Sequence, residues 1–145
     1  MAKKALETAT ADFVQAIGLL VRRVRAAAGV QDVSWSQMSV MKRLGTAGSV
    51  TIADLARAEG VKPQSMGSTI AALEDMGMVE RTPHPTDGRQ MNIRLTANGA
   101  SELKRTGDAK RAWIQQAISQ LDEREQQTLF AAGEIIKRLV ERNGQ

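Results

Sequence analysis

Residues 51–96 contain two short segments with helical hydrophobic spacing, followed by two short segments with the alternation that is typical of β-strands. Gly60 separates the two helical segments, and Pro63 stands where a helix can begin, because a first-turn residue needs no N–H partner. Asp87-Gly88 is a strong turn signal between the two strand segments, residues 78–81 and 90–95. This order predicts a helix-turn-helix followed by a charged β-hairpin.

Further helices are expected before this unit. An apolar stripe at helical spacing comprises Phe13, Ile17, Leu20, Val21 and Val24. Gly29 predicts the end of that helix. Ser34 and Gln37 predict a capping box that opens a second helix, which Gly45 or Gly48 would end. The apolar stripe of this second helix comprises Met38, Met41 and Leu44.

A long helix is expected after Thr96, and Asp122 with Glu125 predicts the cap of a last helix. The inner face of that helix comprises Leu129, Ala132, Ile136, Leu139 and Val140. Neighbouring segments offer little to cover the apolar faces at the two ends of the chain. We therefore expect the end helices to cover one another and those of a second copy.

The fold class predicted from this organisation is mainly α with a small β-hairpin wing. Residues 1–145 would form a single domain, in which residues 34–95 are a winged helix-turn-helix and residues 1–33 and 97–145 are a helical dimerisation part. Because Thr51 and Asp54 also have capping-box spacing, the short helix after Thr51 should begin there.

Composition favours an anionic partner without identifying it. The net charge is +4, with 20 Lys and Arg against 16 Asp and Glu, yet residues 34–95 carry seven basic and six acidic residues. The absence of cysteine excludes a disulfide, a thiolate metal site and a thiol redox switch. Charged residues interrupt the first apolar region, so neither a signal peptide nor a membrane span is expected, and the protein should be cytoplasmic.

The helix after Pro63 carries the first candidate contacts for double-stranded DNA. On a helical wheel its apolar residues fall on one side and its hydrogen-bonding residues on the other. The polar candidates are Gln64, Ser65, Ser68 and Thr69, with Lys62 at the start of the helix. Such side chains contact base edges and phosphates in a major groove. The alternative is an ordinary solvated helix face.

The hairpin tip carries the second candidate contact. The turn itself explains Asp87 and Gly88, but it does not explain an arginine directly after them. Arg89 on a narrow projecting loop can enter an A·T-rich minor groove, where the negative potential is enhanced. A free carboxylate would repel phosphate, so Asp87 is expected to brace the wing.

No other chemistry stands out in the sequence. Nucleophile elbows, phosphate loops and paired carboxylates are absent, and His84 is the only histidine, so neither catalysis, a cofactor nor a metal site is expected. Trp35, Met38 and Trp113 could line an apolar cavity for a small ligand if their helices meet. The alternative is that these three residues only pack in the core.

Two segments carry a resemblance to the MarR family of winged-helix regulators. Residues 87–96, DGRQMNIRLT, match that family's wing pattern D-x-R-x-x-x-(aliphatic)-x-L-T. Residues 73–81, LEDMGMVER, resemble its junction between recognition helix and wing. The segment TPHP at residues 82–85 departs from the more usual polar and basic run, so the resemblance implies no extra phosphate contacts there.

The resemblance implies a homodimer with interlocking terminal helices that binds a pseudo-palindromic operator, usually as a repressor. It also implies release from DNA when a small aromatic or anionic ligand binds. Members that respond through cysteine oxidation are no guide here, because the chain has no cysteine. The alternative function is a winged-helix module that binds another protein and not DNA.

Overall fold

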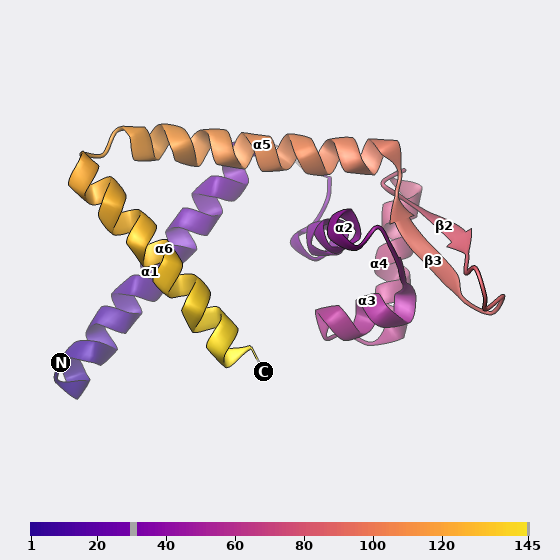
Figure 1. Cartoon of the computed structure of the whole chain (residues 1–145), viewed down its shortest axis with the longest axis horizontal. Coiled ribbons are helices and arrows are strands. Elements are labelled where there is room, and N and C mark those ends of the chain that lie inside the picture. Colours follow the sequence, from indigo (N-terminus) through magenta and orange to yellow (C-terminus); the bar gives the residue numbers. More distant parts are fainter. Residues whose placement is uncertain (30–31, 145) are drawn as a thin grey trace. The chain divides into compact units, whose positions relative to one another are not determined.

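Six helices and three short strands make up residues 1–29 and 32–144, which a computed structural model describes (Figure 1). The elements in chain order are α1 (Lys3–Ala27), α2 (Trp35–Ala47), β1 (Ser49–Thr51), α3 (Ile52–Glu59), α4 (Pro63–Asp75), β2 (Val79–Pro83), β3 (Met91–Leu95), α5 (Ala97–Ser119) and α6 (Glu123–Asn143). The chain forms two compact units, Ala28–Asp108 and a terminal unit of Met1–Ala27 with Ala109–Gln145. The predicted fold class, a mainly helical winged helix-turn-helix, is confirmed.

The sheet of the central unit has three antiparallel strands in the order β1-β3-β2. The predicted hairpin is β2 and β3, in which Arg81 pairs with Ile93 and Pro83 pairs with Met91. Strand β1, whose Val50 also pairs with Ile93, was not predicted. Its three residues are too few to show an alternating pattern, and only the pairing with β3 makes them a strand.

The helix ends follow the capping signals closely. Ser34 and Gln37 form the predicted capping box of α2, and Gly48, with φ +84°, ends that helix. At α3 only half of the predicted box forms. The Thr51 hydroxyl accepts the Asp54 backbone N–H at 3.2 Å. The Asp54 carboxylate does not complete the box, because it pairs with Arg57 one turn along the helix.

Helices α2, α3 and α4 are held against the sheet by one apolar core. Its fully buried members include Met41 and Leu44 of α2, Leu55 of α3, Ile70 and Leu73 of α4, and Ile93 of β3. Burial of such side chains contributes about 1.5–3 kcal/mol each relative to leaving them in water. The core thereby fixes which side of α4 faces inward and which side faces solvent.

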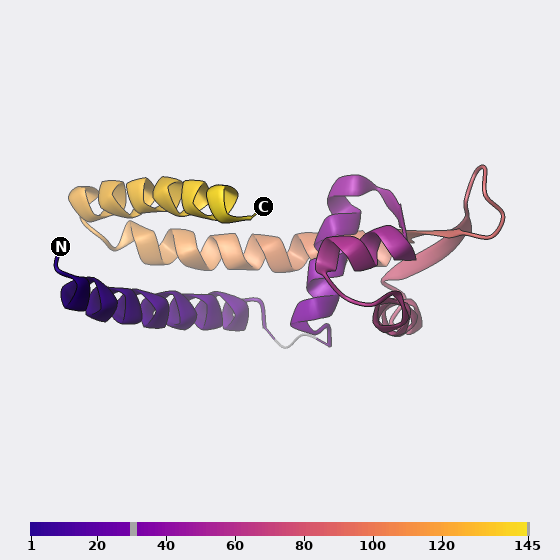
Figure 2. The same ribbon diagram turned by 90° about the horizontal axis from the view of Figure 1, so that it is seen from below.

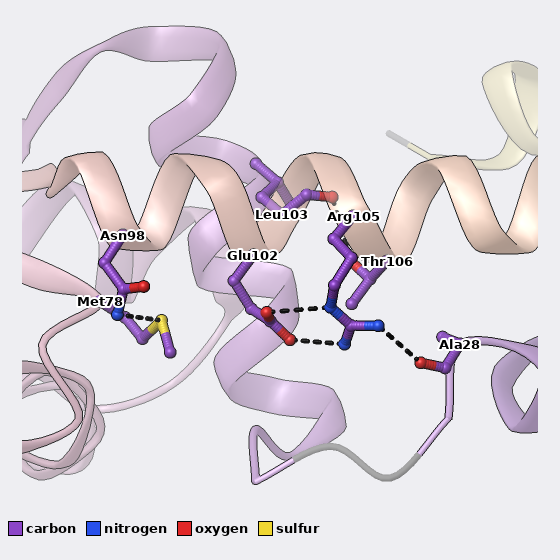
Figure 3. Close-up of polar contacts among 7 residues, drawn as sticks. All are labelled: Ala28, Met78, Asn98, Glu102, Leu103, Arg105 and Thr106. Carbon is purple, nitrogen blue, oxygen red and sulfur yellow. Dashed lines mark hydrogen bonds and ion pairs between the residues drawn. The ribbon is translucent and has the colours of Figure 1, made fainter.

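The first half of α5 is fastened to this unit by a close backbone approach and by a polar cluster. A Cβ added at Gly99 would lie 1.9 Å from the Met78 carbonyl oxygen, so only glycine fits there. Arg105 makes a two-bond ion pair with Glu102, at 2.7 and 3.1 Å, and its Nη1 donates to the Ala28 carbonyl at 3.1 Å (Figure 3). This cluster holds the chain just after α1 against α5.

The terminal unit consists of α1, the second half of α5, and α6, which begins at the predicted Asp122–Glu125 capping box. Helices α1 and α6 cross in the view of Figure 1, but Figure 2 shows them apart, one above the other. Neither helix contains a buried residue. The exposed apolar side chains include Phe13, Ile17 and Leu20 of α1 and Leu129, Ile136, Leu139 and Val140 of α6. Within the described ranges, no helix has the length and apolar character needed to cross a membrane.

Candidate nucleic-acid interface

Glycines define both ends of α4. Gly60, with φ +67°, ends α3 and turns the chain, and Lys62 precedes Pro63 with an extended backbone and no side-chain cap bond. At the other end Gly77, with φ +73°, completes a Schellman motif. In that motif the Met78 N–H donates to the Leu73 carbonyl and the Gly77 N–H donates to the Glu74 carbonyl, each at 2.9 Å. Both ends of α4 are therefore fixed by the local backbone, and the chain passes from α4 directly into β2 of the wing.

The outward side of α4 gathers the predicted polar residues on one face. Because Met66, Ile70 and Leu73 are buried, the opposite face is turned to solvent. Gln64, Ser65 and Ser68 are exposed there and Thr69 is half-buried. Two of the hydroxyls donate to carbonyls one turn earlier, Ser68 to Gln64 at 3.3 Å and Thr69 to Ser65 at 3.2 Å. Their oxygens remain able to accept a hydrogen bond from a base or a water.

The wing tip is folded by its own side chains. Asp87 accepts the backbone N–H of Arg89 at 3.0 Å through one oxygen and the Gln90 side-chain amide at 3.2 Å through the other. His84 accepts the Asp87 backbone N–H at 3.0 Å and the Thr86 backbone N–H at 3.3 Å on Nδ1. Sequence reasoning missed this role of His84, since it requires the folded loop to bring residues two and three positions later onto the ring.

Ion pairing leaves few free cations in residues 34–95. Four of the seven basic residues there are paired with carboxylates, as Arg43–Glu59, Arg57–Asp54, Arg81–Glu74 and Arg94–Glu80. Within this fully described range, the other three basic residues, Lys42, Lys62 and Arg89, have no ion pair. All three are exposed. Lys62 at the start of α4 and Arg89 on the wing are thus sources of positive potential that internal pairing does not cancel.

The three residues predicted for a ligand cavity have different surroundings. Trp35 is the first residue of α2 and its side chain is 57% exposed, whereas Met38 belongs to the apolar core. Trp113 lies in the terminal unit, where the Arg23 guanidinium carbon stands 5.7 Å from its ring centroid. A cavity shared by all three residues stays a prediction. No group of three metal-ligating side chains comes together in the described residues.

Comparison with known proteins places this arrangement in a family. The model of the MarR family matches residues 33–91, which run from just before α2 to the start of β3. The chain is 35% identical over 130 residues to the uncharacterized HTH-type transcriptional regulator Mb0904 of Mycobacterium bovis. That alignment covers 90% of this chain and 91% of the relative.

Solved structures show the same fold at lower identity. RV1404 from Mycobacterium tuberculosis superposes with a TM-score of 0.86 at 23% identity, over 100% of this chain and 99% of that one. Streptococcus pneumoniae FabT in complex with DNA has a TM-score of 0.71 at 20% identity, over 97% of both chains. Together with the winged helix-turn-helix and its wing motif, these matches lead to one conclusion. The chain belongs to the MarR family of transcriptional regulators and is not an enzyme.

Proposed function

We propose that this protein is a homodimeric repressor that binds a pseudo-palindromic operator and is released from it by a small aromatic or anionic ligand. The observation that carries the proposal is the exposed polar face of α4 between two unpaired cations, Lys62 and Arg89. The winged helix-turn-helix of residues 34–95 carries seven basic and six acidic residues and pairs four of its arginines internally, yet it leaves these two cations and Lys42 unpaired, which fits a surface that meets phosphates. A DNA partner would place the protein in the cytoplasm.

In this proposal α4 enters the major groove. Gln64, Ser65, Ser68 and Thr69 would contact base edges or nearby phosphates, and Lys62 would contact the backbone at the start of the helix. Arg89 would enter the adjacent minor groove, where a guanidinium meets concentrated negative potential. Asp87 would act indirectly by holding the Arg89 backbone in place, through the 3.0 Å bond described above.

The terminal helices supply the proposed dimer contact. Their apolar side chains remain exposed in a single chain, and contiguous apolar surface of this kind marks an interface in a soluble protein. A twofold dimer would present two α4 helices to half-sites about 34–36 Å apart, or a multiple of that spacing. This spacing accounts for a pseudo-palindromic operator. The family resemblance supports repression and ligand release.

The test uses Arg89→Ala in a mobility-shift titration on the promoter nearest the protein's own gene. Each arginine that reaches a phosphate displaces counterions, so its loss should weaken binding and lower the log–log salt slope by about one per wing. Arg89→Lys should recover only part of the affinity, because an ammonium is more strongly hydrated than a guanidinium. Asp87→Ala should weaken binding with little change in slope.

Arg124→Ala is the matched control, because it removes one exposed arginine from α6, outside the winged helix. It should leave the slope near that of the natural protein. A folded Arg89→Ala protein with the natural affinity and slope would contradict the wing assignment. Failure of the natural protein to bind any DNA more tightly than a random duplex would favour the alternative, a protein-interaction module.

A further inference from the structure

A histidine between two prolines stands in the wing segment that departs from the family's usual polar and basic run. Pro85 disfavours helical backbone at His84, the residue before it, and Pro83 has its own φ fixed by its ring. The His84 backbone N–H donates to the Gln90 carbonyl at 3.2 Å and closes the loop at its base. The local backbone therefore presets the position from which the His84 ring reaches over the wing tip.

Two backbone N–H groups determine the protonation state of the His84 ring. Nδ1 accepts the Asp87 N–H at 3.0 Å and the Thr86 N–H at 3.3 Å. A ring nitrogen that accepts a hydrogen bond carries no proton, so the neutral ring must hold its proton on Nε2. In the charged ring both nitrogens are donors, and no rotation of the ring restores an acceptor. Only the neutral form with the proton on Nε2 can make these contacts.

The contacts of His84 bear on Arg89 through Asp87. Nδ1 holds the Asp87 backbone, and the Asp87 carboxylate accepts the Arg89 backbone N–H at 3.0 Å. Residues 84–90 are all described and none of them is buried, so hydrogen bonds and not apolar packing order this loop. We propose that His84 is a positioning residue for Arg89, and that protonation of His84 weakens operator binding. The effect on operator binding rests on the proposed function, whereas the state of the ring does not.

The other charged groups of the wing are Asp87 and Arg89 in the loop and Glu80, Arg81 and Arg94 in the strands. The strand charges are engaged in ion pairs, Arg81 with Glu74 of α4 and Arg94 with Glu80. The Asp87 carboxylate bonds to the Arg89 N–H and the Gln90 amide, and not to the ring. Histidine is the only side-chain type among all of these that ordinarily changes charge between about pH 5 and 8.

Two effects of His84 protonation oppose each other. A positive ring near DNA attracts phosphates, but this attraction is screened as the salt concentration rises. Loss of the acceptor sets a ring N–H against two backbone N–H groups, and this local effect is screened much less. Protonation should therefore weaken operator binding more as salt is raised. A histidine that only contacted phosphate would do the reverse, because its protonation would strengthen binding and salt would reduce that gain.

The state of the ring can be measured without DNA, because His84 is the only histidine in the chain. In protein labelled with ¹⁵N-histidine, the two ring-nitrogen shifts distinguish both neutral tautomers and the charged form. We expect the form with the proton on Nε2 at about pH 7.5. The amide signals of Asp87 and Arg89 should then shift with the same midpoint as the ring when the pH falls. A ring with its proton on Nδ1, or wing amides that ignore its titration, would overturn the proposed role.

His84→Asn and His84→Ala separate the acceptor from the charge. The Asn Oδ1 stands as many bonds from the backbone as Nδ1 and can accept the same N–H groups, but it does not titrate. At about pH 7.5, His84→Ala should weaken operator binding about three- to tenfold, the scale of one lost hydrogen bond, and His84→Asn should keep most of the affinity. Between about pH 7.5 and pH 5.5 the natural protein should lose about threefold or more, and His84→Asn should lose less.

Arg89→Ala supplies the matched background, because the proposed role of His84 runs through Arg89. In Arg89→Ala protein, the further change His84→Ala should cost little additional affinity. A full additional loss in that background would show instead that His84 contacts DNA itself. Equal pH dependence in the natural protein and His84→Asn, or tighter operator binding at the lower pH, would also overturn the proposal. If the natural protein bound no operator, the proposed function would fail while the ring and amide titrations still decided whether His84 orders the wing tip.

Discussion

Among the described glycines, Gly99 is the one at which an added Cβ would approach another atom most closely. Its α-carbon lies so near the Met78 carbonyl that a methyl group would force α5 away from the turn before β2. We expect Gly99→Ala to lower the free energy of unfolding by roughly 1–3 kcal/mol or more, the scale of overpacking. Urea unfolding followed by circular dichroism measures this change.

Gly67→Ala is the matched control for Gly99→Ala, because nothing lies within 4 Å of the added Cβ in the middle of α4. It should leave stability unchanged or raise it by up to about 1 kcal/mol, since alanine is the better helix former. Equal stabilities of the two variants would show that α5 is not packed this closely on the turn before β2.

Substitution of the polar residues of α4 should weaken binding to operator DNA more than binding to random DNA. Gln64→Ala, Ser65→Ala and Ser68→Ala should each weaken operator binding by roughly 1–3 kcal/mol if these side chains meet base edges, with a smaller loss on random DNA. Paired titrations on operator and random duplexes measure the difference. Ser101→Ala, on the exposed side of α5, should change neither. If all three variants kept the natural operator preference, another face would read the sequence.

At the scale of elements, the Glu102–Arg105 pair sets how α5 holds the chain after α1. The side-chain hydrogen bond from Arg105 is the main reason why the Glu102 pKa lies below its ordinary value of 4.5, and desolvation only partly opposes it. A lowered carboxyl pKa stabilises the folded state above the ordinary value, and this contribution is lost as the pH falls through the folded pKa. Glu102→Gln should therefore lower stability at pH 7.

The difference between Glu102→Gln and the natural protein should shrink as the pH falls below about 4.5. Thermal unfolding across pH 3–7 would measure it. Glu134→Gln removes one partner of a solvent-exposed pair with Lys137 and serves as the control, with little effect at any of these pH values. A stability difference for Glu102→Gln that persisted unchanged at pH 3 would show that lost packing, not the ion pair, causes it.

Elements with a local signal were predicted and elements made by distant contacts were not. Some features depend only on residues within one helical turn, and a local sequence pattern is enough to predict them. They are the capping boxes at Ser34 and Asp122, the glycine turns and Pro63. Strand β1 exists only through β3, and the Arg105 bond to Ala28 joins residues 77 positions apart. The polar face of α4 was predictable from helical spacing, whereas the ion pairs that leave Lys62 and Arg89 free required the fold.

At the scale of the whole molecule, the terminal unit has an apolar surface that nothing covers in the described residues of a single chain. The stripe of α1 and the inner face of α6 are built from residues of core type, yet both helices lack a buried residue. Such faces cost free energy in water unless a partner covers them. A second copy would bring matching faces and would place two winged helices on one DNA duplex.

Val140→Glu tests this dimer with little risk to the chain itself. The Val140 side chain is 63% exposed in the single chain, so a carboxylate there can stay hydrated in a monomer but would be buried in a dimer. We expect sedimentation at micromolar concentration to show a dimer for the natural protein and a shift toward monomer for Val140→Glu. Operator affinity should fall with it, because one winged helix reaches one half-site.

The charge-matched control is Gln127→Glu, which lies on the opposite side of α6 and should keep the dimer. The natural protein sedimenting as a monomer would contradict the proposed assembly. A Val140→Glu protein that stayed dimeric would mean that other surfaces hold the two copies together. Loss of the dimer with operator affinity unchanged would mean that a single winged helix is enough for binding. A twofold dimer would then no longer explain two half-sites in the operator.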